Sequence, residues 1–206
     1  MSTGAMRILL VGDTEDRYLW DYYEPGRLDD YQLILSTGDL DPRYLSFLAT
    51  FARCPVLYVH GNHDSRYTAI PPEGCLCIED TLFLYKGVRI LGLGGSLRYS
   101  GGDHQYTEQE MAWRIRRKRL RLKASGGCDI LLTHAPAAGL HDGSDPAHRG
   151  FACFLPFLEK YQPAYFIHSH VHPTYQDGYV RSDRCGFTRV INAYDKYVIS
   201  FPPEKE

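Results

Sequence analysis

The sequence predicts an α/β protein built on a parallel sheet, and three observations support this prediction. Short apolar runs rich in β-branched residues occur at 7–12, 31–36 and 56–59, and each has the length of a buried strand. The segments between these runs are long enough for crossover connections. Each run ends in glycine or polar residues, as strands of such sheets do where sites are built. The order β-α-β-α-β therefore predicts a parallel sheet whose acidic residues gather at one edge.

The crossover connections between these strands are expected to be helical. Residues 17–23 follow an acidic stretch that can cap a helix, and Pro25 would end that helix. Pro42 suits the first turn of a second helix, which we expect over 42–52 with its apolar side chains along one face.

The rest of the sheet structure is expected from later runs of the same apolar character. These strands are expected at 81–85, 88–93, 128–133, 163–167, 175–180 and 188–201. The first two flank Lys86-Gly87 and form a hairpin. The last two are expected to be antiparallel, and a helix over 151–161 precedes the strand at 163–167.

A long basic helix is expected after the glycine-rich loop 92–102. Thr107 and Glu110 form a capping box, and the helix continues to about residue 124. Its basic residues are Arg114, Arg116, Arg117, Lys118, Arg119, Arg121 and Lys123. They could bind nucleic acid, but apolar residues such as Met111 leave a stripe that can be buried. We therefore favour a solvated basic face.

The composition limits the class of protein. With 206 residues, of which 44% are hydrophobic, the chain can form one large core, and we expect a single domain over 1–206. The formal net charge of −2 gives no general attraction to nucleic acid or membranes. No apolar run reaches the roughly 18 residues of a membrane span, and no signal peptide is recognisable. The six cysteines include no CxxC pair, so we expect reduced thiols and a cytoplasmic location.

Side chains that commonly bind metals follow five of the predicted strands. They are Asp13, Glu15, Asp39, Asn62, His63, His134, His170 and His172. Each has an ordinary explanation, and Gly61-Asn62-His63-Asp64 alone is as typical of a turn as of a site. Their recurrence at five strand ends favours one shared site. Carboxylates, imidazoles and an amide oxygen suit Mn, Fe, Zn or Co, and there are enough of them for the paired ions used in displacement at phosphorus.

These residues resemble the signature of the calcineurin-like metallophosphoesterases. The motifs in chain order are Asp13-x-Glu15, Gly38-Asp39, Gly61-Asn62-His63-Asp64, Thr133-His134 and His170-x-His172. The resemblance covers about residues 8–173. It implies a four-layer α/β/β/α sandwich with two central mixed β-sheets and a dinuclear metal site at one edge. It also implies hydrolysis of a phosphate ester by a hydroxide that bridges the two ions.

The resemblance also implies a role for each matching residue. Metal one would take Asp13, Glu15, Asp39 and His172, and metal two would take Asp39, Asn62, His134 and His170. Asp39 would bridge the two ions. His63 would stabilise or protonate the leaving oxygen, and Asp64 would orient His63.

Two positions depart from the family pattern. Glu15 stands where the family has His, and Ser169 stands where it has Gly. An additional carboxylate lowers the net charge of the site and favours harder ions. We therefore expect two divalent ions, with Mn favoured over Fe, Zn, Co, Ni and Mg. Glu15 could also turn away from the site, with Asp16 as a substitute.

The substrate is expected to be a small phosphate ester, with a diester slightly favoured over a monoester. Loops 94–106 and 135–150 would form the pocket walls. They supply Arg98, Tyr99, His104, His148 and Arg149 as candidate substrate contacts. The alternative is a weak or inactive member of the fold that binds metal or a partner. A nuclease acting through the basic helix is a third hypothesis, and the oligomeric state stays open.

Overall fold

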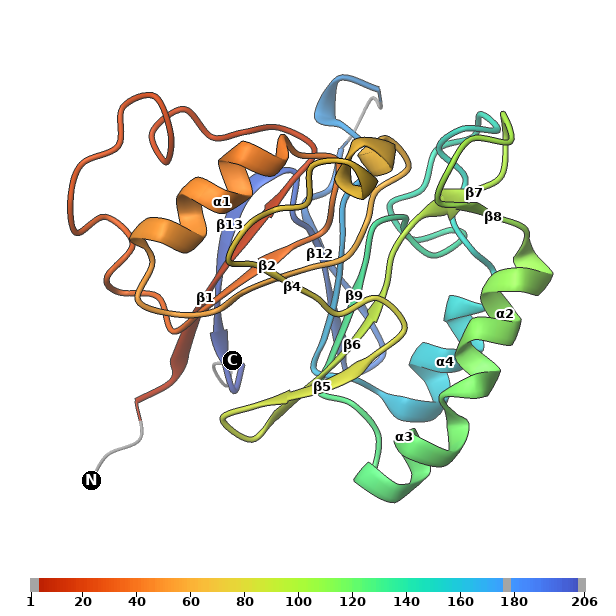
Figure 1. Cartoon of the computed structure of the whole chain (residues 1–206). Helices are drawn as coiled ribbons and strands as arrows, with labels where there is room; N and C mark the ends of the chain where they lie inside the picture. Colours follow the sequence, from red (N-terminus) through yellow and green to blue (C-terminus); the bar gives the residue numbers. More distant parts are fainter. Residues whose placement is uncertain (1–3, 176–178, 204–206) are drawn as a thin grey trace.

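The computed structural model describes residues 4–175 and 179–203, which form four layers (Figure 1). Two mixed β-sheets pack face to face in the centre. One α-helix covers the outer face of the first sheet, and the other α-helices cover the outer face of the second. The α/β/β/α sandwich implied by the resemblance is therefore confirmed.

The first sheet has the strand order β13-β1-β2-β3-β4. Its strands are β1 (Met6–Gly12), β2 (Leu33–Ser36), β3 (Val56–Tyr58), β4 (Leu76–Cys77) and β13 (Asp195–Phe201). Strands β1 to β4 are parallel. β13 runs antiparallel to β1, and Phe201 lies opposite Met6. The parallel arrangement predicted for the first three strands is confirmed, and their carboxyl ends share one edge.

The second sheet has the strand order β11-β12-β10-β9-β6-β5. Its strands are β5 (Leu82–Tyr85), β6 (Val88–Leu93), β9 (Ile130–Thr133), β10 (Tyr165–His168), β11 (Ser182–Cys185) and β12 (Thr188–Asn192). The four central strands are parallel, and the two edge strands are antiparallel to their neighbours. Lys86 and Gly87 have φ values of 47° and 85°, so the predicted hairpin closes with a two-residue turn that needs positive φ.

Helices α1 and α2 begin where Pro42 and the capping box predicted, and the helix expected over 151–161 begins at Phe154. They are α1 (Pro42–Phe51), α2 (Glu108–Arg117), α3 (Arg119–Ser125) and α4 (Phe154–Tyr161). Asp41 caps α1, and Thr107 with Glu110 forms the predicted capping box of α2. The expected single basic helix divides at Lys118, whose N–H bonds to the carbonyl of Ile115, three residues back. Among the described residues, no helix has the length and apolar character needed to cross a membrane.

The side chains of β1 point alternately to the two faces of the first sheet, which explains how the layers are joined. Ile8 and Leu10 face the second sheet and pack in the core between the sheets. Leu9 and Val11 face the other way and pack under α1. Successive side chains of a strand point to opposite faces, so an unbroken apolar run is needed where both faces are buried. A third core lies between the second sheet and α2 to α4.

Two further expectations about secondary structure were wrong, and a third lies partly outside the described residues. Residues 17–23 form turns instead of a helix, with bonds such as Leu19 N to Asp16 O at 3.0 Å. The expected strand 188–201 is two strands in different sheets, β12 and β13. Of the expected strand 175–180, residues 176–178 lie outside the described residues, and 179–180 are irregular.

Candidate metal centre

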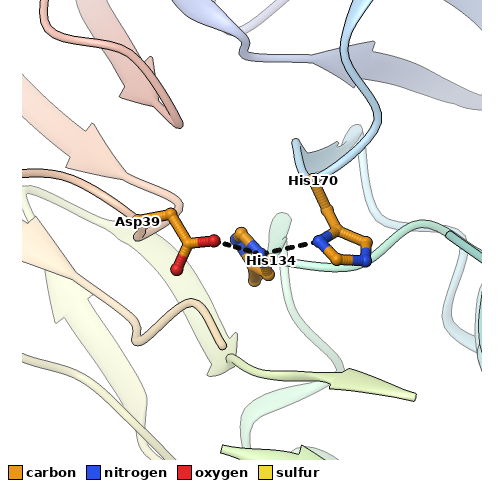
Figure 2. Close-up of side chains that lie close together, drawn as sticks. All are labelled: Asp39, His134 and His170. Carbon is orange, nitrogen blue, oxygen red and sulfur yellow. Dashed lines mark hydrogen bonds and ion pairs between the residues drawn. The ribbon is translucent and has the colours of Figure 1, made fainter. Parts of the chain in front are cut away.

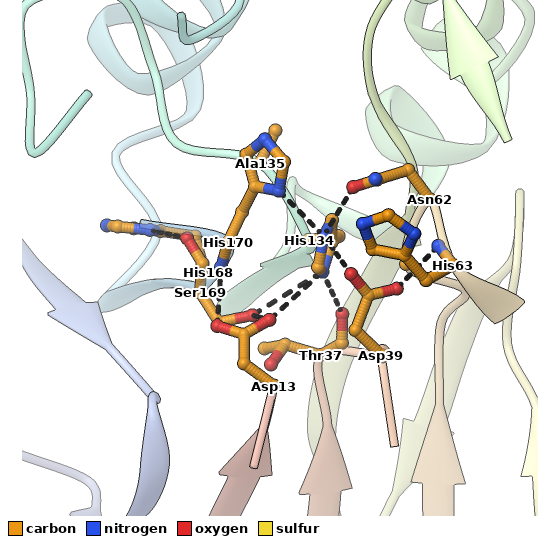
Figure 3. A network of polar contacts seen from close by, with 12 residues as sticks. Asp13, Thr37, Asp39, Asn62, His63, His134, Ala135, His168, Ser169 and His170 are labelled. Atoms are coloured by element: carbon orange, nitrogen blue, oxygen red, sulfur yellow. Dashed lines mark hydrogen bonds and ion pairs between the residues drawn. The ribbon is translucent and has the colours of Figure 1, made fainter. Parts of the chain in front are cut away.

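The carboxyl ends of five strands from both sheets meet at one edge of the sandwich (Figure 3). Each strand is followed by one or more of the predicted polar residues: Asp13 after β1, Asp39 after β2, Asn62 and His63 after β3, His134 after β9, and His170 after β10. Parallel strands within each sheet account for this convergence. Packing of the two sheets then brings the two groups together.

Asp39, His134 and His170 form the compact centre of this group (Figure 2). One ligand atom from each lies within 4.8 Å of the others. His134 Nε2 lies 3.3 Å from Asp39 Oδ2 and 3.1 Å from His170 Nδ1. Asn62 Oδ1 lies 3.0 Å from the same nitrogen. Two imidazole nitrogens, a carboxylate oxygen and an amide oxygen thus surround one point.

The outer hydrogen bonds of the two imidazoles fix their tautomers. His134 Nδ1 lies 2.9 Å from the Thr37 carbonyl oxygen, and His170 Nε2 lies 2.7 Å from the Ala147 carbonyl oxygen. A carbonyl can only accept, so these nitrogens carry the protons. When both rings are neutral, His134 Nε2 and His170 Nδ1 present lone pairs to the centre. Metal-binding histidines typically donate their other ring N–H to a carbonyl oxygen in this way.

The electrostatics of the centre favour a cation. Burial lowers the pKa of His170 to about 3, so this ring stays neutral. Burial also acts against a charged His134, but the nearby Asp39 carboxylate outweighs it and raises the pKa of His134 to about 9. Acceptors facing one another without a donor repel unless a positive charge lies between them. A proton on His134 meets that need, and a divalent ion would meet it better, so the residues fit a metal.

Asp13 and His172 extend the centre on one side. Asp13 Oδ2 accepts from His170 N at 2.8 Å and lies 3.8 Å from His172 Nε2. Ser169, found where the family has Gly, donates to Asp13 Oδ1 at 3.1 Å. Burial raises the pKa of Asp13 to about 7. A nearby cation would lower this pKa and stabilise the charged form of the buried carboxylate.

Glu15 is engaged elsewhere. Its Oε1 accepts from Asp41 N at 2.6 Å, at the start of α1. Its carboxylate is not among the groups that line the cavity described below. Asp16 also points away from the centre, because it pairs with Lys196 and accepts from Leu19 N. The side of the centre formed by Asp13 and His172 is thus built from fewer nearby ligands than the side formed around His134.

The backbone of Gly61-Asn62-His63-Asp64 is held by two carboxylates. Asp39 Oδ1 accepts from His63 N at 2.8 Å, and Asp64 Oδ2 accepts from Gly61 N at 2.7 Å and from Asp39 N at 2.9 Å. A Cβ on Gly61 would lie 2.0 Å from Asp39 Oδ1, which explains the glycine. Asp64, expected to orient the His63 side chain, therefore contacts the backbone around Asp39 and Gly61.

A cavity of about 280 Å³ opens onto the centre. Its lining residues are Asp13, Asp39, His63, Tyr99, Ala147, His148, His170 and His172. The Tyr99 hydroxyl accepts from Asn62 Nδ2 at 3.2 Å, so it lies beside a candidate ligand. His148 Nδ1 lies 2.9 Å from Asp145 Oδ2. Tyr99 and His148, both candidate substrate contacts, thus reach the cavity.

The other candidate substrate contacts do not line this cavity. Arg98 pairs with Glu110 at 2.9 Å, on α2. His104 stacks on His60, with ring centroids 4.3 Å apart. Arg149 is exposed. Both arginines among the candidate substrate contacts therefore lie outside the cavity.

A buried charge network lies at the ends of β3 and β6, and it was not predicted from the sequence. Glu79 accepts from His60 N at 3.1 Å and Gly94 N at 2.8 Å, and it pairs with Arg114. The Arg114 side chain is only 7% exposed, so the expectation that it belongs to a solvated face was wrong. Its position three residues after Met111, on the same helix face, is the signal that could have identified it.

Comparisons with known proteins agree with this geometry. The family model described as calcineurin-like phosphoesterase matches residues 6–174. One solved structure, 13% identical, superposes with a TM-score of 0.69 and covers 98% of this chain and 97% of its own. A structure from Thermus thermophilus, 13% identical, has a TM-score of 0.60 and coverages of 93% and 90%.

A third solved structure, from Staphylococcus aureus, is described as a putative 5'-nucleotidase and is also 13% identical, with a TM-score of 0.54. The match covers 95% of this chain and 51% of that one. No curated protein matches the sequence. At these identities the structural likeness shows the fold alone.

Proposed function

The chain belongs to the calcineurin-like phosphoesterase family, and we propose that it hydrolyses a small phosphate ester with the help of divalent metal ions. The observation that carries this proposal is the convergence of Asp39, Asn62, His134 and His170 on one point at the wall of the cavity. When bound there, divalent ions supply positive charge that activates water and stabilises the charge on phosphoryl oxygens.

We propose unequal roles for the two sides of the centre. Asp39, Asn62, His134 and His170 would hold the tighter ion. Asp39 would share a second ion with Asp13 and His172, and that ion would be held more weakly while Glu15 stays bonded to Asp41 N. Mn remains the favoured metal, because the oxygen ligands on Asp13, Asp39 and Asn62 suit a fairly hard ion.

His63 is the proposed proton donor to the leaving oxygen. It lines the cavity, and its backbone N–H is fixed by Asp39. A donor is useful here because the leaving alkoxide or phenoxide must be protonated or stabilised as the P–O bond breaks. Tyr99, whose hydroxyl accepts from Asn62 Nδ2, is the proposed contact to a phosphate oxygen.

The cavity lining also bears on the substrate. Among the described residues that line it, none is Lys or Arg, and a doubly charged monoester gains more from such cations than a singly charged diester does. This favours a diester slightly. The likeness to a structure described as a putative 5'-nucleotidase keeps a nucleotide monoester as the competing substrate class.

Metal analysis and turnover of the full chain test the proposal together. Aryl phosphate mono- and diesters are assayed with Mn, Co, Ni and Zn, in parallel with measurement of bound metal. His63→Asn should reduce turnover by roughly 100-fold and leave the metal content unchanged. The matched variant His134→Asn should lose metal and turnover together. Binding of metal with no hydrolysis of either ester class would instead favour a metal- or partner-binding member of the fold.

A further inference from the structure

The outer helices of the second sheet form a groove that the proposed hydrolysis does not use. Two adjoining hollows of about 760 and 340 Å³ are lined by residues of α2, α3 and α4, and they share Arg116, Arg119, Lys160 and Tyr161. The larger hollow also contacts Gly127, which precedes β9, whereas His134 follows the opposite end of that strand. The groove is therefore separate from the metal centre.

The walls of the groove are apolar. Leu122 and Phe157 are buried beneath it, and Ile115 and Tyr161 line it. Leu120 lies at its edge and is 84% exposed. Covering an exposed leucine and an adjoining apolar hollow with another apolar surface is energetically favourable, because it removes apolar area from water.

The rim of the groove is cationic. Arg116, Arg119, Lys123 and Lys160 line it. Within the described part of the chain, none of these four forms an ion pair with a carboxylate, whereas Arg89, Arg98 and Arg114 each do. This concentration of uncompensated positive charge stands out in a chain whose net charge is −2.

We propose that this groove binds an acidic amphipathic segment of a partner protein. Carboxylates of the segment would pair with the four cations of the rim. Its apolar side chains would cover Leu120 and the apolar floor of the groove, which Ile115 and Tyr161 line. Nucleic acid fits less well, because a phosphate backbone offers no apolar surface to this floor. Bases also need free aromatic faces, but the Tyr161 ring packs against Phe157 at 4.7 Å and beneath Lys160 Nζ at 5.1 Å.

Fluorescence anisotropy with a defined probe tests the proposal. The probe is a labelled helical peptide of about 16 residues with Leu on one face and Glu on the other. A peptide of the same composition in scrambled order and an oligonucleotide of equal charge are compared with it. The test variant is Arg116→Glu with Arg119→Glu. The matched control is Arg117→Glu with Arg121→Glu, which makes the same charge change at exposed residues that line neither hollow.

The expected result is specific to the groove. The test variant should bind the peptide at least about tenfold more weakly, and the control should change binding less than about threefold. Leu120→Ser, at a side chain with little to lose in the fold, should also weaken binding, and so should Lys160→Glu on α4. Ester turnover should not change in any of these variants.

Several results would overturn the proposal. Equal weakening by the test and control variants would mean that only general charge attraction is involved. Equal binding of the scrambled peptide would remove the role of the apolar floor. Tighter binding of the oligonucleotide, weakened by the same groove variants, would assign the groove to nucleic acid. Absence of peptide binding up to about millimolar concentration would also refute it.

Discussion

Replacement of Glu79 by Gln tests whether the buried charge network formed by Glu79 and Arg114 stabilises the fold. The Glu79 carboxylate joins the ends of both sheets, because it accepts from His60 N after β3 and from Gly94 N after β6. It also neutralises Arg114, a buried residue of α2. Gln keeps the shape of the side chain but removes the charge, and its NH2 group replaces one of the two oxygens that accept from His60 N and Gly94 N, so the change removes the charge and one acceptor together.

The size of the effect follows from the pKa of Glu79. Burial acts to raise this pKa, but hydrogen bonds from His60 and the charge of Arg114 outweigh it and lower the pKa from 4.5 to about 2. That difference corresponds to about 3 kcal/mol of stability at neutral pH. Loss of one partner from a buried pair costs roughly 3–5 kcal/mol. Arg114 keeps Asp80 at 3.1 Å, so we expect the lower end, about 3 kcal/mol.

Urea unfolding at several pH values measures this contribution. Because the pKa of Glu79 is lower in the folded state, its contribution is present above pH 4.5 and is lost as the pH falls toward 2. The difference between wild type and Glu79→Gln should therefore shrink between about pH 4.5 and pH 2. Asp30→Asn, at a carboxylate 77% exposed and paired with Arg7, is the control and should cost less than about 0.5 kcal/mol. A loss below about 1 kcal/mol at pH 7, or one that does not vary with pH, would refute this reasoning.

Three further variants test the centre itself. Glu15→His should strengthen binding of the second ion and shift preference toward softer metals; unchanged stoichiometry and preference by metal analysis would show that position 15 does not reach the ions. Gly61→Ala should displace Asp39, because its Cβ would lie 2.0 Å from Asp39 Oδ1. Metal affinity measured by calorimetry should therefore fall at least about tenfold. Gly4→Ala is the control and should have no effect, because a Cβ there meets nothing within 4 Å. Tyr99→Phe should raise KM severalfold in steady-state kinetics without changing metal content; an unchanged KM would mean that the hydroxyl does not contact substrate.

The strands and the grouping of the candidate ligands could be predicted because their signals are local. An apolar run followed at once by Asp, Asn or His is visible in the sequence, and parallel pairing brings such ends together without further information. This is why Asp39, His134 and His170 could be grouped before their distances were known. The caps at Asp41 and Thr107 are local in the same sense.

The wrong or missing expectations depend on contacts between distant segments. Metal binding by Glu15 stays a prediction, but its hydrogen bond from Asp41 N depends on the placement of α1, which no local pattern reveals. Arg114 looks like its basic neighbours until Glu79, 35 residues away, is seen beside it. The division of 188–201 into two strands depends on which sheet edge is free to accept each one, a property of the assembled fold.

The pairing of β1 with β13 has a consequence for the order of events during synthesis. β1 leaves the ribosome long before β13, its partner along the whole register from Met6–Phe201 to Gly12–Asp195. Until then, one edge of β1 exposes unpaired backbone groups that other chains could bind. Long-range pairing of this kind slows folding. We therefore expect the nascent chain to depend on chaperones, and refolding from denaturant to lose yield as protein concentration rises.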